Sequence, residues 1–165
     1  MDKEIFKNII SIIDNEIKLY TEMRNLYTDK KAALVKNDLD KLAIVDAKII
    51  ENYEGIKKID ALRLDAIKIL GEDAPSMSKL IEIAETRHPK SVAKLKEQQA
   101  QLEILSSSIS VLNLTTMKLI EHGMILADKR LNIIVDACAP KGTSYTDKGA
   151  ENTKDLEIST IIRDV

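Results

Sequence analysis

Residues 89–140 read PKSVAKLKEQQAQLEILSSSISVLNLTTMKLIEHGMILADKRLNIIVDACAP, and this stretch decides the fold. Between its two terminal prolines there is a single glycine, Gly123. The apolar side chains recur at alternating spacings of three and four residues, which predicts an α-helix with one apolar seam. At about 1.5 Å per residue this helix would be about 75 Å long, so we expect shorter helices to pack against it. The seam consists of Leu102, Leu105, Ile109, Leu112, Leu119, Leu126 and Ile133.

Other apolar residues in the second half of this helix fall outside the seam. One neighbouring helix cannot cover both the seam and these additional positions. We therefore interpret this half as a groove for an amphipathic helix, in which methionine provides an adaptable apolar surface. Coverage by a fourth helix, or by a second copy of the chain, is the alternative interpretation. The residues outside the seam are Val111, Leu114, Met117, Met124 and Ile125.

The first half of the chain predicts a pair of antiparallel helices. From Lys3 to Lys36 the apolar residues form a wide stripe, which suits packing against two other helices. Asn37 and Asp38 interrupt this pattern and are residues typical of caps and turns. A second apolar series runs from Leu39 to Leu70 and ends at Gly71, where a helix commonly needs a left-handed residue.

The remaining segments complete the predicted architecture. Residues 72–78 have the composition of a loop, a short helix follows around Leu80–Ala84, and Pro89 suits the first turn of the long helix. We predict an all-α antiparallel helical bundle or coiled coil of three long helices plus one short helix. It would form one domain, residues 1–140, followed by a mobile C-terminal tail, residues 141–165.

Composition supports this fold class and argues against several functions. Apolar side chains make up 44% of the 165 residues and charged ones 32%, with only 5 glycines and 3 prolines, as is typical of long helices. The net charge of −2 provides no basic footprint for nucleic acid. The lone Cys138 cannot close an internal disulfide, and no stretch approaches the roughly 18 apolar residues of a membrane span. We expect a cytoplasmic protein that binds no nucleic acid and does not insert into a membrane.

The sequence offers little catalytic chemistry. Neither His88 nor His122 has a second good ligand four residues away on a shared helical face. Asn52 and Arg63 occupy seam positions of the second helix, and we interpret them as residues that fix the helix register. A ferritin-like metal site needs Glu-x-x-His motifs on facing helices, and this motif occurs once, at Glu85–His88. We therefore predict no enzyme activity, no cofactor and no metal site.

Two blocks of the sequence resemble the FlgN-type flagellar export chaperones. The first is the predicted hairpin turn Lys30–Leu42 with its continuation through residues 48–63, whose aliphatic, Asp-Leu, Lys and Arg spacing is similar to that between the family's first two helices. The second begins at Leu112–Ile120 and ends in the tail segment Tyr145–Gly149. That segment is similar to the family's Tyr-Gly-x-x-Gly segment, with Thr146 in place of the first glycine.

The resemblance implies a cytosolic chaperone that binds the C-terminal helical segment of flagellar hook-filament junction proteins and delivers these proteins to the type III export gate. By carry-over from the family, Tyr145 would contact the cytoplasmic domain of the gate and residues 113–126 would hold the cargo. The alternative is a structural coiled-coil module that forms a homodimer without cargo. The cargo surface that we predict comprises Val111, Leu112, Leu114, Met117, Leu119, Met124, Ile125 and Leu126.

Overall fold

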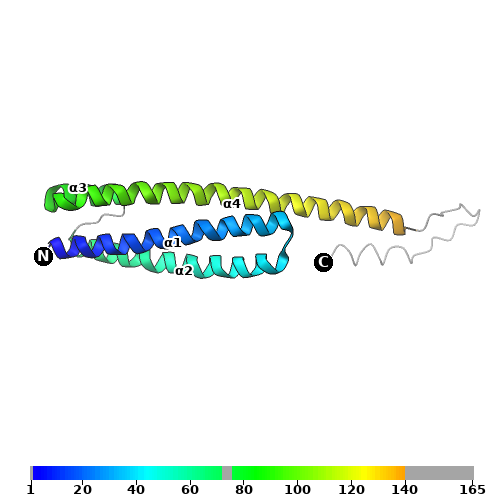
Figure 1. Ribbon diagram of the computed structural model, residues 1–165, viewed down its shortest axis with the longest axis horizontal. Helices are drawn as coiled ribbons and strands as arrows, with labels where there is room; N and C mark the ends of the chain where they lie inside the picture. Colours follow the sequence, from blue (N-terminus) through cyan, green and yellow to red (C-terminus); the bar gives the residue numbers. More distant parts are fainter. Residues whose placement is uncertain (1, 72–75, 140–165) are drawn as a thin grey trace, which may run out of the picture. The chain divides into compact units, whose positions relative to one another are not determined.

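The computed structural model describes residues 2–71 and 76–139, and these residues form four α-helices (Figure 1). The helices are α1 (Asp2–Lys36), α2 (Leu39–Lys68), α3 (Met77–Arg87) and α4 (Pro89–Cys138). The first two lie side by side as an antiparallel hairpin. The predicted all-α bundle of three long helices and one short helix is therefore confirmed for the described part of the chain.

The chain divides into two compact units, Met1–Leu126 and Ala127–Val165. The first unit holds α1, α2, α3 and most of α4, and the described residues of the second are 127–139. The domain boundary that the sequence predicts at residue 140 stays a prediction. The predicted tail, residues 141–165, lies outside the described residues and includes Tyr145.

Local sequence signals set the helix ends. Asn37 adopts a left-handed conformation with φ of 53°, and the Asp38 side chain caps α2 by accepting a hydrogen bond of 3.0 Å from a backbone N–H of the first turn. Gly71, with φ of 74°, is the left-handed residue expected after α2. The Ser76 hydroxyl caps α3 in the same way, at 3.3 Å. The helix therefore begins at Met77, inside the segment that the sequence predicts as loop.

The core of the first unit is concentrated at one end, where all four helices contribute buried side chains. Farther along α4 only Leu105 and Thr116 are buried after Gln98, and no described residue of this helix beyond Thr116 is buried. The core therefore covers the first half of α4 far better than the second. The main cluster contains Phe6, Ile9 and Ile13 of α1, Ala66, Ile67 and Leu70 at the end of α2, Leu80, Ile81, Ile83 and Ala84 of α3, and Leu95 of α4.

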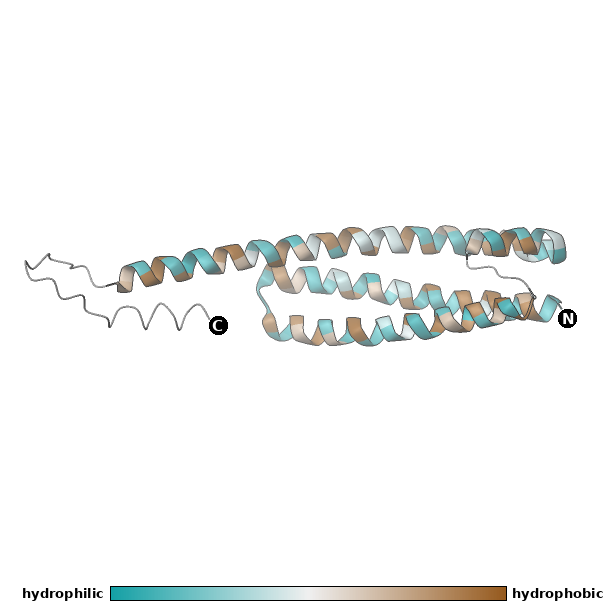
Figure 2. Ribbon diagram, turned by 180° about the vertical axis from the view of Figure 1, so that it is seen from behind, coloured by the Kyte–Doolittle hydropathy of each residue, from teal (hydrophilic) through white to brown (hydrophobic). Residues whose placement is uncertain are grey.

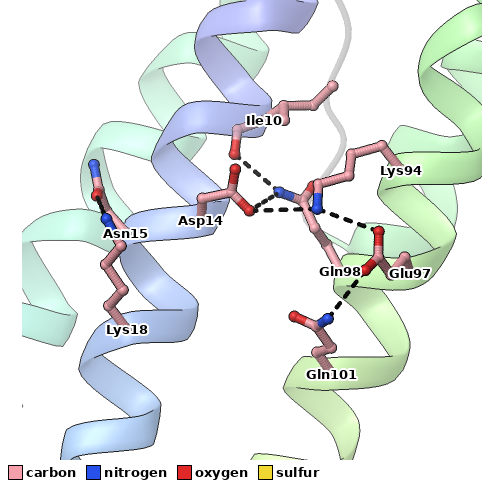
Figure 3. Close-up of polar contacts among 8 residues, drawn as sticks. All are labelled: Ile10, Asp14, Asn15, Lys18, Lys94, Glu97, Gln98 and Gln101. Carbon is pink, nitrogen blue, oxygen red and sulfur yellow. Dashed lines mark hydrogen bonds and ion pairs between the residues drawn. The ribbon is translucent and has the colours of Figure 1, made fainter.

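A buried glutamine joins α4 to α1 in this region (Figure 3). Gln98 is fully buried, and its Nε2 donates hydrogen bonds of 2.9 Å to the Ile10 carbonyl oxygen and to Asp14 Oδ1. Lys94 Nζ lies 3.9 Å from the same carboxylate oxygen. Because a buried amide must find hydrogen-bond partners, sliding α4 by one turn would leave these donors unsatisfied. The contact therefore favours one register of α4 against α1.

Replacing this glutamine tests its contribution to stability. We expect Gln98→Ala to lower the free energy of unfolding by about 1–3 kcal/mol, because the two hydrogen bonds that its buried amide donates are lost. Urea unfolding followed by circular dichroism measures the change. Gln101→Ala is the matched control, since this exposed amide hydrogen-bonds, within the described part of the chain, only to Glu97 on the same helix. We expect a change below about 0.5 kcal/mol. Equal destabilisation by the two substitutions would contradict the role of Gln98.

Candidate functional site

The apolar residues predicted to bind a helical partner lie on the half of α4 that contributes least to the core. Leu112 and Leu119, which belong to the seam, are half-buried. The other six are between 42% and 68% exposed, so the neighbouring helices do not cover them. We call all eight residues the α4 apolar surface: Val111, Leu112, Leu114, Met117, Leu119, Met124, Ile125 and Leu126.

Part of the α4 apolar surface has a shallow, open hollow of about 400 Å³ between side chains of α4 alone. It is lined by Met117, Ile120, Glu121, Met124 and Ile125. The structure thus brings three of the predicted residues together, on a helix that shows hydrophobic residues along its length (Figure 2). Ile120 was missing from the predicted surface. It lies three residues after Met117 and four before Met124, so helical spacing was the signal that could have identified it.

Gly123 occupies a seam position between Leu119 and Leu126. Beyond its chain neighbours and the backbone of its own helix, a Cβ atom built at Gly123 would meet no atom within 4 Å, and the φ of Gly123 is not positive. Neither close packing nor backbone conformation therefore requires a glycine at this point of the free chain. The seam of α4 has an unfilled position here.

A buried ion pair connects α1 to α2. Glu16 is only 4% exposed, and its Oε2 lies 3.5 Å from Nε of Arg63. Neither atom makes a hydrogen bond with the described residues, so the contact is electrostatic. Nη2 of Arg63 also donates a hydrogen bond to Asp60. The sequence predicts that Arg63 fixes the helix register, and pairing with a residue of α1 gives it a physical means of doing so.

Burial changes the acid–base behaviour around this ion pair. Desolvation raises the pKa of Glu16 above its ordinary value of 4.5 because it outweighs the attraction of Arg63, and the negative charge of Asp60 adds to the rise. Burial also raises the pKa of Tyr20, with a further contribution from the charge of Glu16. The ionised Glu16 carboxylate is therefore an unfavourable group in the folded protein.

The ferritin-like alternative does not fit the contacts of its motif. Glu85 pairs with Lys96 at 3.0 Å, while His88 Nδ1 lies 2.7 Å from Ser91 Oγ and the imidazole stacks on Phe6. Among residues 2–71 and 76–139, no group of three or more His, Cys, Asp or Glu side chains is placed to hold a metal ion. No described helix combines the length and apolar character needed to cross a membrane.

The raised pKa of Glu16 predicts a pH-dependent stability. Between pH 4.5 and this raised pKa, the folded protein binds more protons than the unfolded chain, so the free energy of unfolding falls as pH rises. Glu16→Gln removes this contribution. The difference in free energy of unfolding, variant minus wild type, should therefore be more positive at pH 7 than at pH 4.5. Urea unfolding of both proteins at both pH values measures this difference. Glu22→Gln, at an exposed position of α1, is the control. A difference from wild type that is equal at both pH values would contradict the prediction.

Comparison with known proteins gives one result. The chain matches the family model described as FlgN protein over residues 1–153, a range that spans all four helices. No curated protein and no solved structure matches the chain. Proteins of the matched family are chaperones that bind flagellar export substrates. The chain therefore belongs to the FlgN family of flagellar export chaperones.

Proposed function

We propose that this protein binds the C-terminal helical segment of flagellar hook-filament junction proteins and delivers them to the type III export gate. The observation that carries the proposal is the exposure of the α4 apolar surface in a chain of the FlgN family. Large apolar side chains gathered on one stretch of helix are typical of protein-binding surfaces. The proposal assigns this surface to cargo.

The guest in this proposal is an amphipathic helix. Met117, Ile120 and Met124 follow helical spacings of three and four residues, which present one line of apolar side chains to a helix lying along α4. The flexible thioethers of the two methionines adapt to different guest side chains. Such a surface fits a family of related segments better than one rigid partner.

Binding on this surface would both protect the cargo and remain reversible. An export substrate with an amphipathic assembly segment exposes an apolar face that favours premature association, and covering this face prevents it. The guest segment loses conformational entropy when it folds on the chaperone, which keeps the affinity moderate. Release to the export machinery then needs no nucleotide hydrolysis by the chaperone.

Delivery to the gate is assigned to Tyr145, which lies outside the described residues. The assignment is supported by the resemblance of Tyr145–Gly149 to the family's tail segment. A tyrosine ring can bury about 150 Å² on contact, enough for a docking anchor. In this proposal cargo and gate use separate parts of the chain, so both can be bound at once.

Two substitutions test the cargo surface. Met117→Glu and Leu114→Asp should each weaken binding of a junction protein's C-terminal segment by about tenfold or more, because each places a charge in an apolar contact. Fluorescence anisotropy with a labelled segment measures the affinity. Ile50→Glu is the matched control on α2, since Ile50 is 66% exposed and Met117 57%. Unchanged binding by both surface variants would remove this surface from the function.

Sedimentation equilibrium separates cargo binding from self-association. The homodimer alternative predicts a tight dimer of the free chain that Met117→Glu dissociates, together with no binding of the junction-protein segment. That combination would support a structural coiled-coil module and overturn the chaperone proposal for this surface.

A tail substitution tests the division of labour. Tyr145→Ala should retain cargo affinity and lose binding to the cytoplasmic domain of the export gate, because it removes only the proposed anchor. Pull-down of each partner by the purified variant measures both properties. Tyr53→Ala, which removes an exposed tyrosine of α2, should retain both. Loss of cargo and gate binding together in Tyr145→Ala would show that the two functions share one site.

A further inference from the structure

A second groove, to which the proposed function assigns nothing, opens between α4 and the α1–α2 hairpin. Its volume is about 580 Å³. Val111 lines it and also belongs to the α4 apolar surface, so the two are continuous. The lining residues that matter for the argument are Glu16, Arg63, Glu103, Ser106, Ser110 and Val111.

The charges in and around this groove are unbalanced. Glu16, Glu103 and Arg63 line it, so two carboxylates meet one guanidinium in the groove itself. Asp60 also pairs with Arg63, and Arg24 lines the adjoining hollow beside Glu103. Oε2 of Glu16 is buried and has no hydrogen bond among the described residues. Its nearest cationic atom, Arg63 Nε, lies 3.5 Å away and makes no hydrogen bond with it, so the charge of the Glu16 carboxylate is only partly compensated. The groove therefore favours a cation.

We propose that this groove receives a lysine or arginine side chain of the same cargo helix that lies on the α4 apolar surface. This inference rests on the proposed function and specifies the chemistry of the cargo. Leu114 and Ser106 are about 12 Å apart along the α4 axis, so a guest helix that covers Leu114 reaches Ser106 with about two further helical turns. Its cationic side chain packs its aliphatic stem on Val111 and donates to the Glu16 carboxylate.

Other guest side chains fit the groove less well. An acidic side chain would face the carboxylates of Glu16 and Glu103, and an apolar one would add nothing to the partial compensation of Glu16 by Arg63. The small side chains of Ser106 and Ser110 leave room for the guest to approach α4 closely, and their hydroxyls can accept further hydrogen bonds from a guanidinium or ammonium group.

A double-mutant cycle tests the contact. The probes are a synthetic peptide of a junction protein's C-terminal helix and copies in which each Lys or Arg is replaced in turn by Gln, titrated calorimetrically against the full-length chain. We expect Glu16→Gln to weaken the native peptide about tenfold, as for a hydrogen bond to a charged group. One of the Gln-substituted peptides should bind the wild-type chain about tenfold more weakly than the native peptide does. The same peptide should bind Glu16→Gln as well as it binds the wild-type chain. Glu22→Gln should bind every peptide as wild type does.

A second variant makes the test independent of the buried carboxylate. Glu103→Gln removes the charge of the other carboxylate that lines the groove without adding bulk, so it should weaken the native peptide and leave the coupled Gln-substituted peptide unaffected. If Glu16→Gln and Glu103→Gln both bind the native peptide as wild type does while Met117→Glu does not bind it, the cation site is wrong and the proposed function stands. If no substituted peptide is coupled to Glu16, the cation site is likewise wrong. Failure of wild type to bind the peptide would overturn the proposed function, and this inference with it.

Discussion

The buried amide of Gln98 holds α4 at one position along α1, and the environment of the following α4 residues up to Leu126 depends on that register. Its two donated hydrogen bonds reach the Ile10 carbonyl and the Asp14 carboxylate from one side chain. Thr116, the last buried residue of the described helix, comes 18 residues later, or about 27 Å along the axis. No α4 residue from Met117 to Leu126 is buried, which leaves this part of the α4 apolar surface available.

Polar groups take part in this bundle at positions that apolar residues usually fill. Glu16, Asn52, Gln98 and Thr116 are all buried, and some of their atoms lack hydrogen-bond partners among the described residues. Each unsatisfied atom lowers the stability of the folded chain. In return, polar pairing across helices penalises shifted registers more strongly than leucine contacts do. A chaperone benefits from this arrangement because a fixed register keeps the same α4 side chains exposed and the same ones buried.

The helices were predictable because their signals are local, whereas the buried polar contacts were not. Asn37, Gly71 and Pro89 mark the ends of helices by backbone preferences that act without tertiary contacts. Glu16 and Gln98 have side chains that usually face solvent, and only the partner helix reveals why they are buried. The spacing of these two residues from neighbouring apolar residues did, however, indicate that they face the core.

Glu16 lies four residues after Ile12 and three before Leu19, in the middle of the apolar stripe of α1, and Gln98 lies three residues after Leu95. Periodicity also could not show where the hairpin stops covering α4, so Leu105 and Leu126 look equivalent in the sequence although only Leu105 is buried. That boundary depends on the length of α1 and α2.

Gly123 has a mechanical consequence for this boundary. A glycine in a helix interior costs about 1 kcal/mol relative to alanine, and here no neighbouring atom occupies the space that a methyl group would take. Glycine restricts the backbone least, so it makes α4 easier to bend next to Met124, within the surface that we propose binds cargo. Under that proposal, bending at this point would let one chaperone match guests of different curvature while the register set by Gln98 stays unchanged.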